Sequence, residues 1–316
     1  MTRVVALAGG VGGAKLVYGL SKILDPSQFS AIINTGDDFS HLGLMISPDI
    51  DSVVYSLAGL TNDKTGWGRK DETWNCLSVL KELNSETWFQ IGDKDLGLHL
   101  ERTKLLNQGL TLTEVTKALC KKMGVLHSIF PMSDDPVRTM IETEELGEIP
   151  FQEYFVKHHF QPRYRGIRYA GIEAARLSKK ALRELQEADL VIICPSNPWL
   201  SIFPILEIPH VKNLLKKKTT IAVSPIIGNS AVKGPASKIF NELGIKPSGY
   251  EVAKMYRPFL TGFVLDHENE LEQEGIRSFG IIPLVTDTLM KNDNDKQRLA
   301  SEVLGFAINL KKDLHL

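Results

Sequence analysis

Residues 3–20, RVVALAGGVGGAKLVYGL, decide the fold that this sequence predicts. The apolar run VVALA (4–8) is typical of a strand that is buried on both faces. Four glycines follow it, and AKLVYGLSKIL (14–24) then carries apolar side chains at helical spacing. The segment FSAIINTGDD (29–38) predicts a second strand that ends in a polar loop. Strand, glycine turn, helix and strand form a βαβ unit, so the two strands are expected to be parallel.

The glycine turn contains Gly9, Gly10, Gly12 and Gly13, and Lys15 follows it. It is not a P-loop, because no Gly-Lys-Ser/Thr is present, and it is not the dinucleotide fingerprint, because Lys15 stands where a third glycine is needed. Glycines bring backbone N–H groups close to an anion, and a helix starting near Gly13 would point its positive end there. We interpret the turn as a phosphate site to which Lys15 adds charge. A tight strand–helix turn that binds nothing is the alternative.

The rest of the chain predicts an open α/β sheet interrupted by an insertion. Buried strands are expected within ADLVIICPSNP (188–198) and KKTTIAVSPIIGN (217–229), and a helix over PASKIFNELGI (235–245). Before them, helical patterns cover 71–84, 93–109 and 111–124, the last with a capping box from Thr111 to Glu114, and short strands are expected within 127–133 and 137–143. We predict one domain, 1–316, with a mostly parallel core of approximately 1–60 and 180–316. A largely helical insertion, approximately 60–180, is expected over the carboxyl edge of the sheet.

Composition narrows the class of protein. The net charge is −1, which provides no field favouring nucleic acid or an anionic membrane. The longest apolar runs, such as LVIIC (190–194), are far below the roughly 18 residues that span a bilayer. The first residues lead directly into a predicted strand, so we expect no secretory signal. Cys76, Cys120 and Cys194 have no metal-ligand spacing, and each is expected to be a small buried hydrophobe. We expect a cytoplasmic protein.

Polar loops follow the predicted strands, at the sheet edge where open α/β folds bind ligands. They are the glycine turn, NTGDD (34–38), PSNPW (195–199) and SPIIGN (224–229). Their convergence is the main indication of a site.

Carboxylates are concentrated at 37–51. Asp37 and Asp38 end the second of these loops, and SPDID supplies Asp49 and Asp51. The spacing puts Asp49 and Asp51 on one side of an extended loop, or puts Asp51 at a helix N-cap. Oxygen ligands from two loops suit Mg²⁺ beside phosphate, and a carboxylate there could also accept a proton from a hydroxyl. Ordinary turn and cap chemistry is the alternative.

Two further segments carry weaker signals. In GDKDLGLHLERT (92–103), His99 and Arg102 lie one helical turn apart, which favours a structural histidine over a basic pair aimed at a phosphate. In TGWGRKDETWN (65–75), Trp67 and Trp74 either pack as hydrophobic staples or form a flat wall for an aromatic ligand.

Together these motifs resemble the CofD family, the 2-phospho-L-lactate transferases of deazaflavin-coenzyme biosynthesis. The resemblance rests on GGVGGAKL, NTGDD, SPDID, WGRKDETW, IGDKDLGLHLERT, PMSDDPV, RGIRYAGIEAA, PSNPWLSIFPIL and SPIIGNSAVKGPA, in order along nearly the whole chain. It implies a Rossmann-like core with a helical insertion, and a Mg²⁺-dependent homodimer. It also implies transfer of a phospholactyl or phosphoenolpyruvyl group from a guanosine diphosphate ester to the ribityl hydroxyl of a deazaflavin precursor, with release of GMP. The acyl group of the donor stays open.

The resemblance also implies roles for single residues. The turn from Gly9 to Gly13, with Lys15, would meet the diphosphate. Asp37 and Asp51 would hold Mg²⁺, with Asp51 close to the acceptor hydroxyl as base, although the reverse assignment stays open. Gln90 replaces a basic residue that archaeal members carry near the deazaflavin. The guanosine side would be lined by Ser196, Asn197, Gly228 and Asn229. The competing functions are a CofD-like regulatory protein that binds nucleotide sugars without transfer, for which SPDID is the wrong loop, and a nucleotide-binding scaffold.

Overall fold

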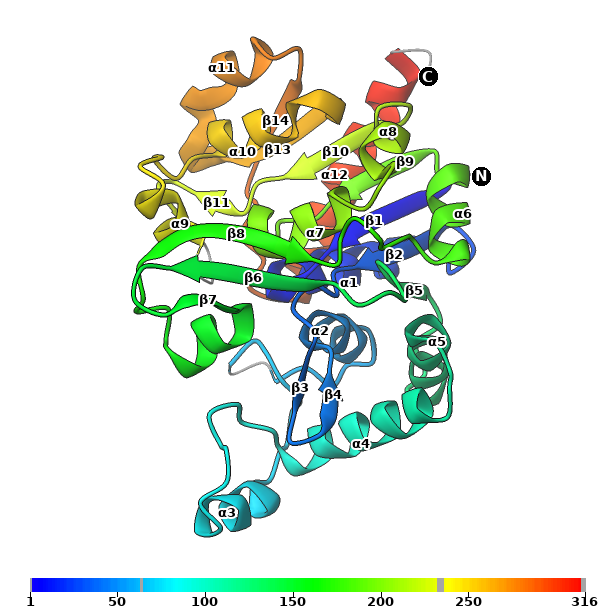
Figure 1. The fold of residues 1–316 in the computed structure, drawn as a ribbon. Helices are drawn as coiled ribbons and strands as arrows, with labels where there is room; N and C mark the ends of the chain where they lie inside the picture. The colour runs from blue at the N-terminus through cyan, green and yellow to red at the C-terminus, as the bar shows by residue number, and fades with distance from the viewer. Residues whose placement is uncertain (1, 63–64, 232–235, 314–316) are drawn as a thin grey trace.

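The central element is a seven-stranded sheet, seen in a computed structural model that describes residues 2–62, 65–231 and 236–313 (Figure 1). The strand order is β14-β13-β10-β9-β1-β2-β5, and every pair is parallel. The strands are β1 Val4–Ala8, β2 Phe29–Ile33, β5 Ser128–Pro131, β9 Leu190–Ile193, β10 Thr219–Val223, β13 Gly262–Asp266 and β14 Ile282–Thr286. This is the Rossmann order extended by one strand, with the reversal of order between β1 and β9. The predicted α/β class and the parallel βαβ unit are confirmed.

Both faces of the sheet are covered, as the continuous apolar strands predicted. Along β1, Val4, Ala6 and Ala8 pack into one core, whereas Val5 and Leu7 pack into the other. The alternation is the two-residue period of a strand, and a parallel sheet needs helices on each side to bury both sets.

One covering layer consists of α1 Gly10–Ile23, α2 Pro48–Leu57 and α12 Asp293–Asp313, with α1 in contact with the other two. Gly19 allows α1 and α12 to approach closely, because an added Cβ would overlap the Lys296 carbonyl oxygen. Helix α1 begins at Gly10, earlier than the expected start near Gly13. The other helices that follow the insertion in the chain are α6 Lys179–Glu187, α7 Phe203–Leu206, α8 Val211–Leu215, α9 Ala236–Glu242, α10 Gly249–Tyr256 and α11 Gln273–Arg277. Shorter helical turns cover Glu153–Lys157, Pro198–Ile202, Arg257–Phe259 and His267–Glu272. The predicted helix over 235–245 corresponds to α9, and Pro235 lies outside the described residues.

The insertion is only partly helical, which corrects the expectation for 60–180. Its first half contains α3 Asn75–Glu82, α4 Asp93–Asn107 and α5 Leu112–Lys122, and the Thr111 capping box is confirmed. Its second half contains an antiparallel sheet, β7-β6-β8, made of β6 Arg138–Thr143, β7 Gly147–Pro150 and β8 Tyr164–Ala170. The strand before it, β5, pairs with β2 in the central sheet. Core and insertion therefore share the central sheet. The sequence did not predict this pairing, because the residues that pair with a strand lie far away in the chain and leave no local pattern.

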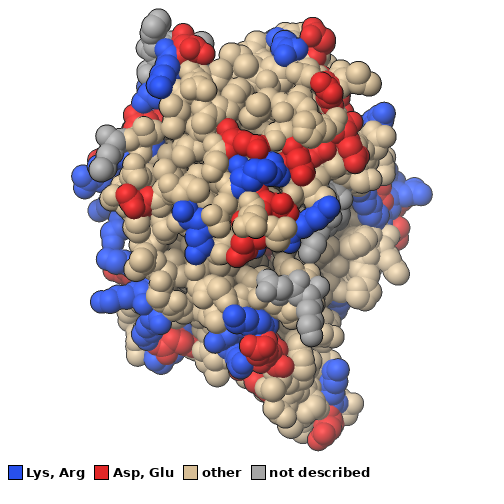
Figure 2. Space-filling model, turned by 180° about the vertical axis from the view of Figure 1, so that it is seen from behind, with Lys and Arg blue, Asp and Glu red and all other residues tan. Residues whose placement is uncertain are grey.

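Two short hairpins complete the structure: β3 Phe39–His41 with β4 Leu44–Ile46, and β11 Ile226–Ile227 with β12 Ser230–Ala231. Helix α3 projects away from the body of the molecule (Figure 1). Cys76 is exposed on α3, so the expectation of burial is wrong there, whereas Cys120 and Cys194 are buried. Within the part of the chain that the structure describes, no helix has the length and apolarity to cross a membrane. Figure 2 shows positive and negative side chains interspersed over one face, in keeping with the net charge of −1.

Candidate functional site

Three of the four predicted loops meet at the carboxyl ends of β1, β2 and β9. Ala8 is paired with Ile33, and Leu7 is paired with Ile193, so these strands end at the same level. Beyond their ends, Ser196 Oγ donates to the Gly9 carbonyl oxygen at 2.7 Å. The fourth loop, 224–229, follows β10 at the same edge, and Asn269 holds it through two hydrogen bonds of 2.8 Å with the Gly228 backbone.

The glycine turn is packed tightly against its neighbours. A Cβ at Gly12 would overlap the Pro195 carbonyl oxygen, and one at Gly9 would overlap the Asp49 carboxylate. Gly10 has a φ of +63°, and its N–H donates to Asp49 Oδ1 at 2.7 Å. Close packing alone therefore requires glycine at these positions, and Asp49 already satisfies one N–H at the start of α1. Other N–H groups of the first turn have no partner within an α-helix and remain suited to an anion.

Asp37, Asp38 and Asp49 form an acidic cluster beside this turn. The three side chains belong to residues that are only 7%, 3% and 6% exposed. Asn34 donates to Asp49 Oδ2 at 2.8 Å, and Ser47 donates to Asp38 Oδ2 at 2.8 Å. Asp37 Oδ1 and Asp38 Oδ1 are buried without a hydrogen-bond partner among the described residues. Buried carboxylate oxygens with no partner are costly, so these two oxygens are available to a cation or to a hydrogen-bond donor of a ligand.

The cluster has perturbed acidity. Burial raises the pKa of Asp37 well above its usual range, and the charges of Asp49 and Asp38 add to the effect. Burial also raises the pKa of Asp38 to about 8 and that of Asp49 to about 6. Without a cation, the cluster therefore retains protons that free aspartates would lose.

These shifts predict a stability that falls with rising pH. Asp38 ionises near pH 4 in the unfolded chain but near pH 8 when folded, so folding retains a proton between those values. Its stabilising contribution is complete below about pH 4 and is lost as the pH rises through about 8. In chelator, the melting temperature should fall between about pH 5 and pH 8.5, and Asp38→Asn should reduce that fall. Exposed Asp25→Asn should follow the parent chain, and an unchanged fall in Asp38→Asn would contradict the assignment.

Asp51 lies in the first turn of α2, and its carboxylate is paired with Arg102 of α4. Helix α2 begins at Pro48 after Ser47, so Asp51 is neither in an extended loop nor at the N-cap. Arg102 Nη1 donates to Asp51 Oδ2 at 3.0 Å, and Nη2 donates to Oδ1. Both residues are buried, with Arg102 only 1% exposed. In this structure Asp51 therefore faces Arg102.

His99 extends the same buried network. Its Nδ1 lies 3.1 Å from Arg102 Nη1, and its Nε2 lies 3.2 Å from Asp95 Oδ2. The Tyr55 hydroxyl in turn donates to Asp95. The geometry favours the structural interpretation of His99 and Arg102 over a basic pair aimed at a phosphate. No group of three or more His, Cys, Asp or Glu side chains in the described residues has the arrangement of a metal site.

A cavity of about 270 Å³, here called the aromatic pocket, opens beside the acidic cluster. Asp37 and Asp38 line it together with Phe39, Trp88 and Arg138. Trp88 and Phe39 lie with ring centroids 5.9 Å apart. The pocket thus offers apolar ring faces next to carboxylates, which suits a flat conjugated molecule carrying hydroxyl groups. Gln90 follows the Trp88 segment and is exposed.

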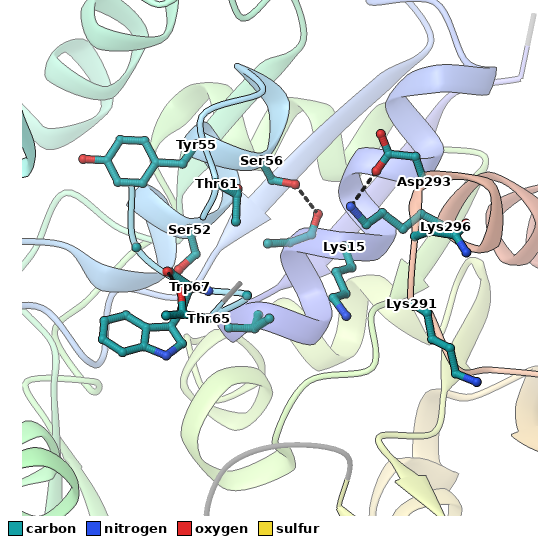
Figure 3. Close-up of a pocket in the computed structure, with 15 residues that line it drawn as sticks. Lys15, Ser52, Tyr55, Ser56, Thr61, Thr65, Trp67, Lys291, Asp293 and Lys296 are labelled. Atoms are coloured by element: carbon teal, nitrogen blue, oxygen red, sulfur yellow. Dashed lines mark hydrogen bonds and ion pairs between the residues drawn. The ribbon is translucent and has the colours of Figure 1, made fainter. Parts of the chain in front are cut away.

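A second cavity of about 470 Å³, the lysine pocket, lies between α1, α2 and the start of α12 (Figure 3). Its charged lining residues are Lys15, Lys291, Lys296 and Asp293. Lys15 Nζ donates to the Met290 carbonyl oxygen at 2.6 Å. Hydroxyls and aromatic rings also line it, from Ser52, Tyr55, Ser56, Thr61, Thr65 and Trp67. Trp67 is 56% exposed and Trp74 is 44% exposed, so neither is a buried staple, and Trp67 supplies a wall of this pocket.

The other predicted binding residues lie along the same edge of the sheet. Ser196 is buried against Gly9, and Asn197 Oδ1 accepts from the Trp199 and Leu200 N–H groups. The Asn197 side-chain nitrogen is buried and has no partner among the described residues, so it can donate to a ligand. Asn229 is exposed. Arg138 and Lys291 were missed by sequence reasoning, because each carries only a common charge at a position remote in the chain from the glycine turn. Arg102 was singled out with His99, but its pairing with Asp51 was not expected.

Comparison with known proteins identifies the family. The family model described as 2-phospho-L-lactate transferase CofD matches residues 4–299. The chain belongs to the CofD family. The 2-phospho-L-lactate transferase of Methanopyrus kandleri is 39% identical, over 98% of each chain. The same-named protein of Methanosarcina acetivorans is 37% identical over 96% of this chain and 98% of that one. The phosphoenolpyruvate transferase of Kitasatospora aureofaciens is 35% identical over 96% of this chain and 98% of that one.

A solved structure with the same fold is that of a UPF0052 family protein from Bacillus halodurans. It has a TM-score of 0.62 and 14% identity, and the match covers 96% of this chain and 98% of that one. At this identity the likeness concerns the fold alone. The CofD relatives are named as transferases, and this CofD chain is accordingly an enzyme that transfers a phosphate-containing group.

Proposed function

We propose that this CofD enzyme transfers a phospholactyl or phosphoenolpyruvyl group from a guanosine diphosphate ester to the ribityl hydroxyl of a deazaflavin precursor. The acceptor oxygen forms a bond to the phosphorus that carries the acyl group, and the bond from that phosphorus to GMP breaks. The acceptor proton passes to a carboxylate as the new bond forms. The main requirements are charge neutralisation and alignment, since no covalent nucleophile is needed.

The single observation that carries the proposal is the acidic cluster placed beside the glycine turn. The Gly10 N–H donates to Asp49, and Asn34 donates to the same carboxylate. Asn34 also accepts from the Gly36 N–H at 2.8 Å, and Asp37 directly follows Gly36. These hydrogen bonds join the backbone N–H groups of the glycine turn and the carboxylates of the acidic cluster within one connected set of loops. The aromatic pocket lies on the Asp37 side of that set, and the lysine pocket lies on the α1 side.

Asp37 and Asp38 suit Mg²⁺ better than Asp51 does. Asp37 and Asp38 offer buried oxygens without partners, whereas Arg102 already engages both oxygens of Asp51. We therefore propose Asp37, with Asp38 beside it, as the residues that hold the ion. When bound, Mg²⁺ supplies positive charge that offsets the charge of the diphosphate. Asp51 stays a proposed base, which requires that substrate binding release it from Arg102.

The donor is proposed to lie between the glycine turn and the lysine pocket, with Lys15 on the diphosphate. The acceptor is proposed to lie in the aromatic pocket, with its ring against Trp88. Ser196, Asn197 and the loop with Gly228 and Asn229 are proposed for the guanosine, a role that the unpaired Asn197 nitrogen supports. The resemblance to the family also supports a cytoplasmic homodimer, and light scattering would test the dimer.

Mass spectrometry of the product tests the reaction. The enzyme is incubated with the deazaflavin precursor, Mg²⁺ and either the lactyl or the phosphoenolpyruvyl guanosine diphosphate ester. One of the two donors should yield an acceptor that carries an additional phosphodiester with the acyl group, together with GMP. Absence of product with both donors, from a folded enzyme, would contradict the proposed reaction.

Ligand preference distinguishes the competing function. If the chain were a CofD-like regulator, nucleotide sugars of uridine would raise its melting temperature more than guanine nucleotides do. We expect the opposite, a larger shift with GDP and Mg²⁺ than with UDP-sugars. A larger shift with UDP-sugars would favour the regulator.

Lys15→Ala tests the placement of the diphosphate. Loss of one charge-assisted contact should weaken donor binding roughly 10- to 100-fold, while the chain stays folded. The measurement is the Kd for GDP with Mg²⁺ by calorimetry. Lys22→Ala, at the other end of α1, is the matched control and should bind GDP like the parent chain. Unchanged affinity in Lys15→Ala would make Lys15 a structural residue.

A further inference from the structure

The lysine pocket contains two further lysines besides Lys15, the residue proposed to contact the diphosphate. Lys15 comes from α1, whereas Lys291 and Lys296 come from a segment 275 residues away that the Lys15–Met290 hydrogen bond ties to it. The pocket also contains one acidic residue, Asp293. The lining thus carries three positive charges and one negative charge, a local excess on a chain whose net charge is −1.

Lys296 and Asp293 neutralise each other. Lys296 Nζ lies 2.8 Å from Asp293 Oδ1 and sits 4.7 Å from the centre of the Tyr18 ring. The Tyr18 hydroxyl donates to the other Asp293 oxygen at 2.7 Å. Lys296 is thus paired with an acidic side chain, whereas Lys291 is exposed and lines the same cavity as Lys15.

Lys291 is placed to act with Lys15. Its backbone N–H donates to Asp295 Oδ2 at 2.9 Å, which anchors the residue just before α12 begins. The side chains of Lys15 and Lys291 extend toward the same side of the pocket, whereas Lys296 turns to Asp293 (Figure 3). The two ammonium groups therefore place positive charge on the same side of the cavity.

The proposed donor has one anionic group that no residue has yet been assigned to bind. Its diphosphate is proposed to meet the start of α1, Lys15 and Mg²⁺, but its acyl half also carries a carboxylate. A lysine ammonium beside the phosphate contact complements such a group. We propose that Lys291 binds the carboxylate of the donor and so selects carboxylate-bearing diphosphate esters, an inference that rests on the proposed function.

The test compares two donors that differ only at that carboxylate. One is the guanosine diphosphate ester of the hydroxy acid that the parent enzyme uses, and the other is the corresponding primary amide. The parent enzyme should prefer the acid. In Lys291→Met, kcat/KM for the acid should fall on the order of tenfold, while kcat/KM for the amide stays unchanged. Lys291→Arg should restore most of the preference, because it keeps the charge.

The matched control is Lys312→Met, which removes the same charge from an exposed position at the far end of α12. It should leave both donors unaffected. Equal losses with acid and amide in Lys291→Met would show that Lys291 binds a phosphate, and no loss with either would show that it binds nothing, so both results overturn the inference. Failure of the parent enzyme to transfer from any ester would instead overturn the proposed function.

Discussion

Asp37→Asn is expected to lower turnover by roughly 10²- to 10⁴-fold while the chain remains folded, the range that loss of an essential charged group produces. The substitution removes the negative charge of a buried carboxylate that has one oxygen without a partner and that faces the aromatic pocket. Asparagine keeps the size of the side chain, and it also removes repulsion from Asp38 and Asp49. Stability should therefore be equal to that of the parent chain or higher.

Two measurements check this expectation. Product formation is followed by chromatography at saturating Mg²⁺, and the melting temperature is measured with chelator. Asp71→Asn, which makes the same chemical change at an exposed position, should retain full turnover. Near-normal turnover of Asp37→Asn would remove Asp37 from the reaction. A collapse of the melting temperature would instead show that the acidic cluster is structural.

Arg102→Met is expected to destabilise the chain by about 3–5 kcal/mol, the cost of leaving one member of a buried ion pair without its partner. Arg102 contacts Asp51 with both terminal nitrogens, and His99 lies against it. Without the guanidinium, the Asp51 charge stays buried, since Asp51 is only 5% exposed. Methionine fills much of the volume of the arginine stem, so the loss reflects charge more than a cavity.

The double variant Arg102→Met/Asp51→Asn separates the charge effect from packing. Removing both charges should recover most of the lost stability, measured as the free energy of unfolding in urea. The single variant Asp51→Asn should lower turnover if Asp51 is the base, and should alter only stability if it serves Arg102 alone. A single variant Arg102→Met as stable as the parent chain would contradict the buried pair.

Local patterns predicted the elements well where they repeat over several residues. The run VVALA and the helical spacing after the glycines predicted β1 and α1, and the Thr111 capping box marked the start of α5. The start of α2 was missed because Pro48 opens the helix ahead of the two aspartates, a position that the fixed φ of proline suits. The antiparallel sheet β7-β6-β8 was recognised only in part, because its aromatic and basic strands lack a clear period.

The candidate site divides in the same way. Asp37, the glycine turn and Lys15 lie next to strand ends, so residue type and position were enough to select them. Contacts between residues distant in the sequence were not predictable. The hydrogen-bonded residues are 39 positions apart for Asp49 and Gly10, 51 for Arg102 and Asp51, and 275 for Lys15 and Met290. Many acidic and basic residues in the chain could have filled these places equally well.

The sequence by itself determined the alternation of strands and helices, the parallel βαβ start and the polar loops at the strand ends, because periodicity and turn chemistry act over a few neighbouring residues. Only the tertiary structure decided that Asp51 faces Arg102, that Asp38 and Asp49 share a buried cluster with Asp37, and that a second lysine stands beside Lys15. Those contacts form when the strand order of the sheet brings distant loops to one edge, and burial there sets the charge that each carboxylate can hold.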